Sequence, residues 1–171
     1  TNGAFQWATY FGGPGNEGYN PALRADASGV YVLSTAIAPG NIPITLGPSF
    51  GGIQDRYLAK FSPDGKQLLW SRFLGGAGTE FCETHCLAMD SGGNLFAAFT
   101  TGSTGLATPG AYDTTFNGGC QVSGTCGNYT QDGIVIKLNS SGTILAASYF
   151  GGSNGDGVEG VGVDAAGNVY F

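Results

Sequence analysis

Short apolar segments alternate along the chain with turns rich in glycine, asparagine and aspartate. Three apolar segments end alike, at 7–13 (WATYFGG), 70–76 (WSRFLGG) and 146–152 (AASYFGG). Each is followed by two apolar stretches joined by a short Asp/Gly turn, as at 161–170 (VGVDAAGNVY). Such segments predict β-hairpins, and no window shows the period of an amphipathic helix. The pattern therefore predicts an all-β chain made of repeated hairpins.

A further hairpin occurs twice, at 55–70 and 132–146, so the repeating unit has four strands, A to D. Four-stranded antiparallel units in series are typical of the blades of a β-propeller. We place the last strand of a preceding blade at 1–18, blades at 19–74 and 83–150, and the first hairpin of a further blade at 158–171. Because a propeller has about 4 to 8 blades, we expect the chain to be part of a longer polypeptide.

Several of these elements together resemble the bacterial SBBP β-propeller repeats. They are the Tyr-Phe-Gly-Gly ends, the hairpin at 163–170, the Ile-Lys-Leu-Asn hairpin and the linker at 108–119 (TPGAYDTTFNGG). The resemblance covers nearly the whole chain, although the linker at 44–52 (ITLGPSFGG) keeps the pattern only loosely. It implies a partial propeller from an exported or cell-surface bacterial protein, and it implies no general activity.

The direction of the strands separates the connections into two sets. The A–B and C–D turns are short and lie at one edge, while the B–C and D–A connections lie at the opposite edge. The B–C connections are long and differ in length, covering about 36–54 and 103–131. Variable loops on a rigid scaffold often carry binding, so we expect the functional surface at this second edge.

All four cysteines, Cys82, Cys86, Cys120 and Cys126, fall at that edge. Four cysteines allow three pairings, and the sequence does not choose among them. The exported character that the resemblance implies favours disulfides over free thiols. The alternative is a metal site, because Cys82 and Cys86 have an acceptable ligand spacing with His85 between them.

Other residues at that edge suggest weaker sites. Acidic side chains could bind Ca²⁺ through oxygen ligands, the candidates being Glu80, Glu83, Asp113, Asp156 and Glu159. No calcium-loop motif is present, so we expect no cofactor. The aspartates of the A–B turns (Asp26, Asp90, Asp164) are expected to bond their own backbone. Two sequons place candidate glycosylation sites at Asn128 and Asn139.

Charge and composition exclude some classes of function. The 6 Lys and Arg residues are scattered, and the net charge is −6, so a nucleic-acid partner is not expected. No apolar run is long enough to form a transmembrane segment. The chain has one histidine and no Gly-x-Ser-x-Gly motif, which gives little support for catalysis.

The leading interpretation is a non-enzymatic extracellular or cell-surface scaffold or adhesion module. Its long-loop edge would bind a protein, a glycan or a surface. A structural subunit is one alternative, in which terminal strands complete a blade between neighbouring chains and build a ring or filament. Part of a secreted hydrolase or lyase acting on polysaccharide is the other.

Overall fold

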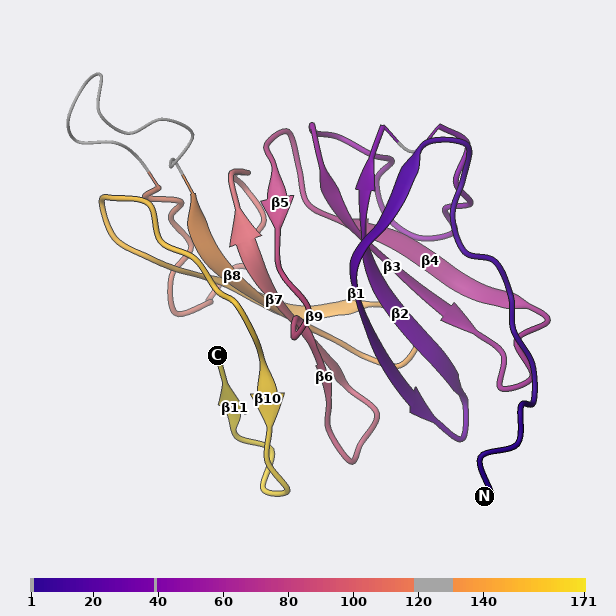
Figure 1. The fold of residues 1–171 in the computed structure, drawn as a ribbon. Helices are drawn as coiled ribbons and strands as arrows, with labels where there is room; N and C mark the ends of the chain where they lie inside the picture. Colours follow the sequence, from indigo (N-terminus) through magenta and orange to yellow (C-terminus); the bar gives the residue numbers. More distant parts are fainter. Residues whose placement is uncertain (1, 39, 119–130) are drawn as a thin grey trace.

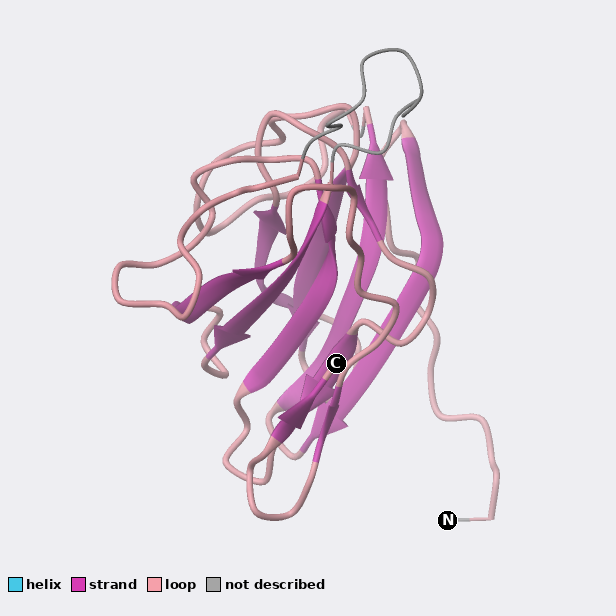
Figure 2. Cartoon of the chain, turned by 90° about the vertical axis from the view of Figure 1, so that its left-hand side faces the viewer, coloured by secondary structure: helices cyan, strands magenta, loops and turns pink. Residues whose placement is uncertain are grey.

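The computed structural model describes residues 2–38, 40–118 and 131–171, and within these ranges the chain contains strands and no helix (Figures 1 and 2). The first sheet is a meander of four antiparallel strands in chain order. Its strands are β1 (Asn16–Asp26), β2 (Gly29–Ile37), β3 (Asp55–Phe61) and β4 (Leu68–Leu74). The prediction of an all-β chain is confirmed.

The second sheet repeats this order with one change, because its first strand is in two pieces. Both pieces pair with the next strand, and the two strands that follow are added in chain order. The strands are β5 (Glu80–Phe81), β6 (Leu87–Met89), β7 (Leu95–Thr101), β8 (Asp132–Leu138) and β9 (Ile144–Phe150). A separate hairpin of β10 (Gly162–Val163) and β11 (Val169–Tyr170) ends the chain. The two sheets cover most of 19–74 and 83–150.

The segment before β1 differs from the strand expected at 1–18. Residues 2–15 form no strand, and β1 already begins at Asn16. A β-strand needs a hydrogen-bonded neighbour, and the described part of the chain offers none to this segment. Its assignment to a preceding blade therefore stays a prediction.

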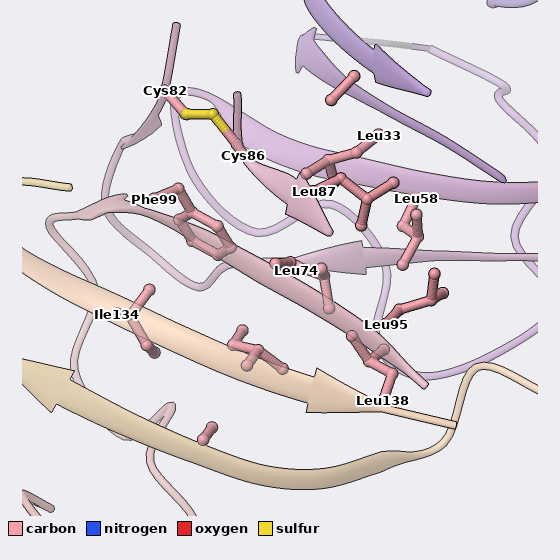
Figure 3. Close-up of a cluster of buried hydrophobic side chains, with 14 of the residues drawn as sticks. Leu33, Leu58, Leu74, Cys82, Cys86, Leu87, Leu95, Phe99, Ile134 and Leu138 are labelled. Carbon is pink, nitrogen blue, oxygen red and sulfur yellow. A yellow bond between two sulfur atoms is a disulfide. The ribbon is translucent and has the colours of Figure 1, made fainter. Parts of the chain in front are cut away.

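The two sheets pack face to face around the main hydrophobic core. Alternate residues of each strand point to opposite faces, and Leu58 of β3 meets the face of the second sheet that carries Ile134 and Ile136. Figure 3 shows this core between the sheets, with Leu33, Leu74 and Leu87 among its members. The stacking explains why nearly continuous apolar strands such as β7, which is buried on both faces, occur in the sequence.

A second set of apolar residues covers each outer face. On the first sheet, Tyr57, Ala59 and Phe73 form a cluster that Phe11 closes from the N-terminal segment. On the second, Phe96 and Ala98 pack with Val161, which leads into the terminal hairpin. Each sheet therefore lies between two apolar layers.

Two tryptophan side chains contact the turns that join the third and fourth strands of the two sheets. The indole Nε1 of Trp70 in β4 donates to the carbonyl of Ser140 at 3.0 Å, in the turn between β8 and β9. Trp7 donates to the carbonyl of Pro63 at the same distance, in the turn between β3 and β4. The equivalent place of the two tryptophans in the sequence repeat is thus matched by an equivalent contact.

Gly142 is required by both the turn and the indole, which gives a test of the packing between sheets. Gly142→Ala places a side chain at φ +83°, with a Cβ 2.8 Å from Leu46 and 3.0 Å from Trp70. Gly167→Ala is the matched control, since its φ is +86° but nothing lies within 4 Å. The control should cost about 1–2 kcal/mol of unfolding free energy from backbone strain alone.

We expect Gly142→Ala to cost roughly 1–3 kcal/mol more than the control, because the close contacts add to the same strain. Urea unfolding of both variants measures the difference. Equal losses of unfolding free energy in the two variants would show that the close packing of Gly142 against Trp70 does not contribute to stability.

Candidate functional site

The long connections meet at one edge, which we call the loop edge (residues 38–54, 75–79, 102–118 and 151–159). Figure 1 shows these connections at the top, opposite the turns that join β1 to β2 and β6 to β7. Hydrogen bonds join neighbouring connections, from Ile53 N to Gly78 O at 3.0 Å and from Gly102 N to Thr79 O at 3.0 Å. The structure thus brings together the B–C and D–A connections that the strand directions predict at one edge.

Each B–C linker is held against the last strand of its own sheet. Thr45 N donates to Ser71 O at 3.1 Å in the first sheet, and Thr108 N donates to Ala147 O at 2.9 Å in the second. Aromatic pairs repeat in the same way, with Phe50 against Phe73 and Phe116 against Tyr149. The first linker, whose sequence keeps the repeat pattern only loosely, therefore makes equivalent contacts.

A buried aspartate at the start of the third strand fixes the end of each linker. Asp55 Oδ2 accepts from Gly51 N at 2.9 Å. Asp132 Oδ2 accepts from Asn117 N at 2.7 Å and from Gly118 N at 2.9 Å. Both side chains are at most 1% exposed. Backbone amides supply the hydrogen bonds that a buried carboxyl needs.

Asp55 forms a carboxyl pair with Glu80 of β5, which joins the two sheets. A Cβ built on Gly75 would lie 2.5 Å from both Asp55 Oδ1 and Glu80 Oε2, so the two carboxyls converge on this glycine. The other oxygen of Glu80 accepts from Thr101 Oγ1 at 2.7 Å. Burial, followed by the hydrogen bond with Glu80, raises the pKa of Asp55 to about 7.

A shared proton accounts for the geometry of this pair. Among the described residues no donor reaches Asp55 Oδ1, and two buried carboxylates this close would repel each other. A proton on one carboxyl turns the repulsion into a hydrogen bond. We therefore expect the contact between β3 and β5 to be strongest while the pair holds that proton.

The corresponding pair in the second sheet, Asp132 and Asp156, is looser. Asp156 is one methylene shorter than Glu80, and its Oδ2 accepts from Gly152 N at 2.6 Å. Burial raises the pKa of Asp132, and the carboxylates of Asp156 and Asp113 raise it further. A cavity of about 270 Å³ lies nearby, lined in part by Asp113, Gly151 and Asp156.

The calcium candidates do not form one site. Glu80 is buried in the carboxyl pair, whereas Glu83 and Glu159 are exposed. Asp156 lines one cavity with Asp113 and another with Glu159. In the described ranges no group of three or more His, Cys, Asp and Glu side chains has a metal-binding arrangement.

Cys82 and Cys86 form a disulfide (Figure 3). Their Cα atoms lie 6.3 Å apart, within the usual range, and both residues are buried. The loop that they close separates β5 from β6 and interrupts the first strand of the sheet. The bond between the two sulfurs favours the disulfide over a metal site at Cys82, His85 and Cys86. Cys120, Cys126 and Asn128 lie outside the described residues.

The turn aspartates act as expected. Asp90 Oδ1 accepts from Gly92 N and Asn94 N, both at 2.9 Å. Asp164 Oδ1 accepts from Ala166 N at 2.9 Å and Asn168 N at 2.8 Å. Asn139 uses its Oδ1 in the same way, accepting from Ser141 N and Thr143 N. The turn explains this residue, and its glycosylation stays a prediction.

Asp55 and Asp132, which hold the linkers, are the residues of the candidate site that the sequence interpretation missed. Each aspartate begins a strand, and the linker before that strand contains a Gly-Gly pair. The two aspartates occur at the same place in the sequence repeat. A charged residue at the head of an otherwise apolar strand was the available signal.

The comparisons with known proteins add no family. Neither the comparison with protein-family models nor that with curated proteins finds a match for this chain. In the described ranges there is no helix of the length and apolarity needed to span a membrane.

The carboxyl pair predicts that stability falls as the pH rises. The pKa of Asp55 in the folded state is about 7, above the ordinary aspartate value of 3.8, so the folded state binds the proton more tightly. The stabilisation is complete below the unfolded pKa and is lost as the pH rises through the folded one. We expect urea unfolding to show a loss on the order of 3 kcal/mol between pH 4 and pH 8.

Asp55→Asn should remove most of this dependence, because its amide donates to Glu80 at every pH. The variant should be more stable than the parent at pH 8. Asp64→Asn is the control, since Asp64 lies in an exposed turn and its neighbour Ser62 lowers its pKa. A parent protein as stable at pH 8 as at pH 5 would contradict the shared proton.

The local disulfide gives a second prediction, which uses the single methionine of the chain, Met89. Cyanogen bromide cleaves after Met89 and yields fragments 1–89 and 90–171. If Cys82 pairs with Cys86, the fragments separate without a reductant. Fragments that stay joined until dithiothreitol is added would show a bond from Cys82 or Cys86 to Cys120 or Cys126.

Proposed function

We propose that this chain is part of a propeller-type stack of four-stranded units that serves as a non-enzymatic scaffold, binding its partner through the loop edge. The observation that carries the proposal is the anchoring of both linkers by a buried aspartate. This arrangement holds long loops of different sequence on a constant framework. Such a division between framework and loops is typical of binding modules.

The relation between successive units supports the propeller-type architecture. We call the face that carries Leu58 in the first sheet, and the face that carries Phe96 in the second, the forward face; the opposite face is the rear face. The forward face of the first sheet packs on the rear face of the second. The terminal hairpin packs on the forward face of the second sheet. Consecutive units therefore meet through the same kinds of faces. Repetition of one such step gives either a closed ring of blades or an open stack.

An extracellular or cell-surface location, in bacteria as the SBBP resemblance implies, fits the disulfide between Cys82 and Cys86. Disulfides persist mainly in oxidising compartments. Only 11% of the residues of the chain are charged. Tyr112 is 94% exposed on the second linker, and aromatic rings of this kind can contact a glycan or a protein.

The carboxyls of the loop edge favour a scaffold over a catalyst. Asp55, Asp132 and Asp156 each accept hydrogen bonds from backbone amides of the connections. These bonds assign the carboxyls a positioning role in the framework. His85 is exposed and lies within 3.0 Å of the hydroxyl of Thr84.

Binding of the intact chain to a printed glycan array, used as the probe, tests the proposal. The paired substitutions Tyr112→Ser and Asp113→Lys change the loop edge. Asp64→Lys changes an exposed turn at the opposite side and serves as the control. We expect the loop-edge variant to lose at least tenfold in binding to any glycan that the parent retains, with the control unchanged.

Binding that survives the loop-edge changes, or no glycan binding at all, would contradict a glycan-binding loop edge. Turnover of a bound polysaccharide that depends on Asp113 would favour the enzyme alternative instead.

A further inference from the structure

The forward face of the second sheet carries an open apolar groove beside the terminal hairpin. The groove has a volume of about 450 Å³. Phe96, Lys137, Ala146 and Phe150 line it from the sheet, and Phe171 closes one side. Phe150 and Phe171 are each more than half exposed. Exposed aromatic side chains gathered around a groove mark an interaction surface.

The same place on the first sheet is filled, which shows what the groove accommodates. There the turn between β8 and β9 is held by three donors. Lys60 Nζ donates to Ser140 O at 3.3 Å, and Trp70 Nε1 donates to the same oxygen at 3.0 Å. Arg72 Nη1 donates to Gly142 O at 2.6 Å. The first sheet therefore binds the backbone carbonyls of a hairpin turn.

The second sheet keeps the central part of this receptor. Lys60 pairs with Tyr31 across the strands and lies 4.9 Å from its ring centroid. Lys137 pairs with Phe96 in the same register and lies 5.4 Å from that ring. Opposite the lysine, Ala146 stands where the first sheet has Trp70. The smaller side chain leaves the space that makes the groove.

A free strand edge lies beside the groove. In the described residues β11 pairs only with β10, whereas β2, its counterpart in the first sheet, also pairs with β3. Val169 of β11 lines the groove. An added strand could thus pair with β11 while its neighbour covers β8 and β9.

We propose that this groove binds a β-hairpin of the third-and-fourth-strand type from a further unit, with Lys137 donating to a carbonyl of its turn. An apolar side chain of the hairpin fills the space above Ala146, and its first strand extends the β10–β11 sheet. The inference rests on the stacked architecture proposed above. Tyr112 of the loop edge also lines the groove. The test below changes Lys137, which lies outside the loop edge, so the glycan-array result and this test can fail independently.

The test uses the whole chain and a cyclised, fluorescently labelled peptide of residues 132–150 as the probe hairpin. We expect saturable binding by fluorescence anisotropy, at least fivefold weaker for Lys137→Met. This variant keeps the length of the side chain and removes the charge. Lys66→Met is the control, because Lys66 is exposed in a turn, and it should bind as the parent does.

A second measurement covers the case in which the peptide does not fold. The chain is lengthened after Phe171 by a copy of residues 98–150, which supplies the hairpin in the same polypeptide. Acetylation of Lys137 by acetic anhydride should then slow at least fivefold, with Lys66 unchanged.

Failure of both the peptide and the lengthened chain to engage Lys137 would overturn the proposal. Two other results would also overturn it. Protection of Lys137 by dodecanoate, with no effect of the hairpin, would make the groove a small-molecule site. Protection that rises with the concentration of the unmodified chain would make it a contact between copies.

Discussion

The buried aspartate at the head of each third strand is the interaction on which the rest of the structure depends. Asp55 and Asp132 are placed where three chain segments meet, namely the end of the linker, the start of the strand and the glycine after the fourth strand. A buried carboxyl must be neutralised or fully hydrogen-bonded. The linker amides bond one oxygen, Oδ2, of each carboxyl, and these bonds fix the position of the linker end. The other oxygen, Oδ1, has no hydrogen-bond partner among the described residues.

The same constraint links the two sheets to each other. Glu80 brings a second carboxyl to Asp55 from the following sheet, and Gly75 leaves the space in which both can lie. Burial raises the pKa of Asp55, so we expect this contact between the two sheets to depend on pH as well as on geometry. Where Asp156 replaces the longer glutamate, the carboxyl turns to the amide of Gly152 and a cavity opens beside it.

At the far ends of the strands, packing between units depends on hairpin turns instead. The indole of Trp70 in the first sheet donates to a turn carbonyl of the second sheet, and that of Trp7, which precedes β1, donates to a turn carbonyl of the first. Glycine at the fourth turn position allows the ring to approach, and Gly65 and Gly142 both have positive φ. A polar contact to backbone carbonyls tolerates changes in the turn sequence, which differs between Ser-Pro-Asp-Gly and Asn-Ser-Ser-Gly.

By itself, the sequence determined the all-β class, the hairpin turns and the four-stranded unit, because these follow from local chemistry. The period of two in a strand and the backbone bonds of Asp90, Asp164 and Asn139 require only near neighbours. The common edge of the long loops also followed, since strand direction alone decides it. Tertiary structure was needed for everything that joins distant segments.

The carboxyl pair of Asp55 and Glu80 depends on the stacking of two sheets, which no local pattern contains. The choice of Cys86 as the partner of Cys82 depends on where β5 ends and β6 begins. The open groove over Ala146 depends on which faces lie covered. The carboxyl pair and the groove depend on distances between residues far apart in the chain, and the disulfide depends on the path of the backbone between β5 and β6. Only the packed structure sets these quantities.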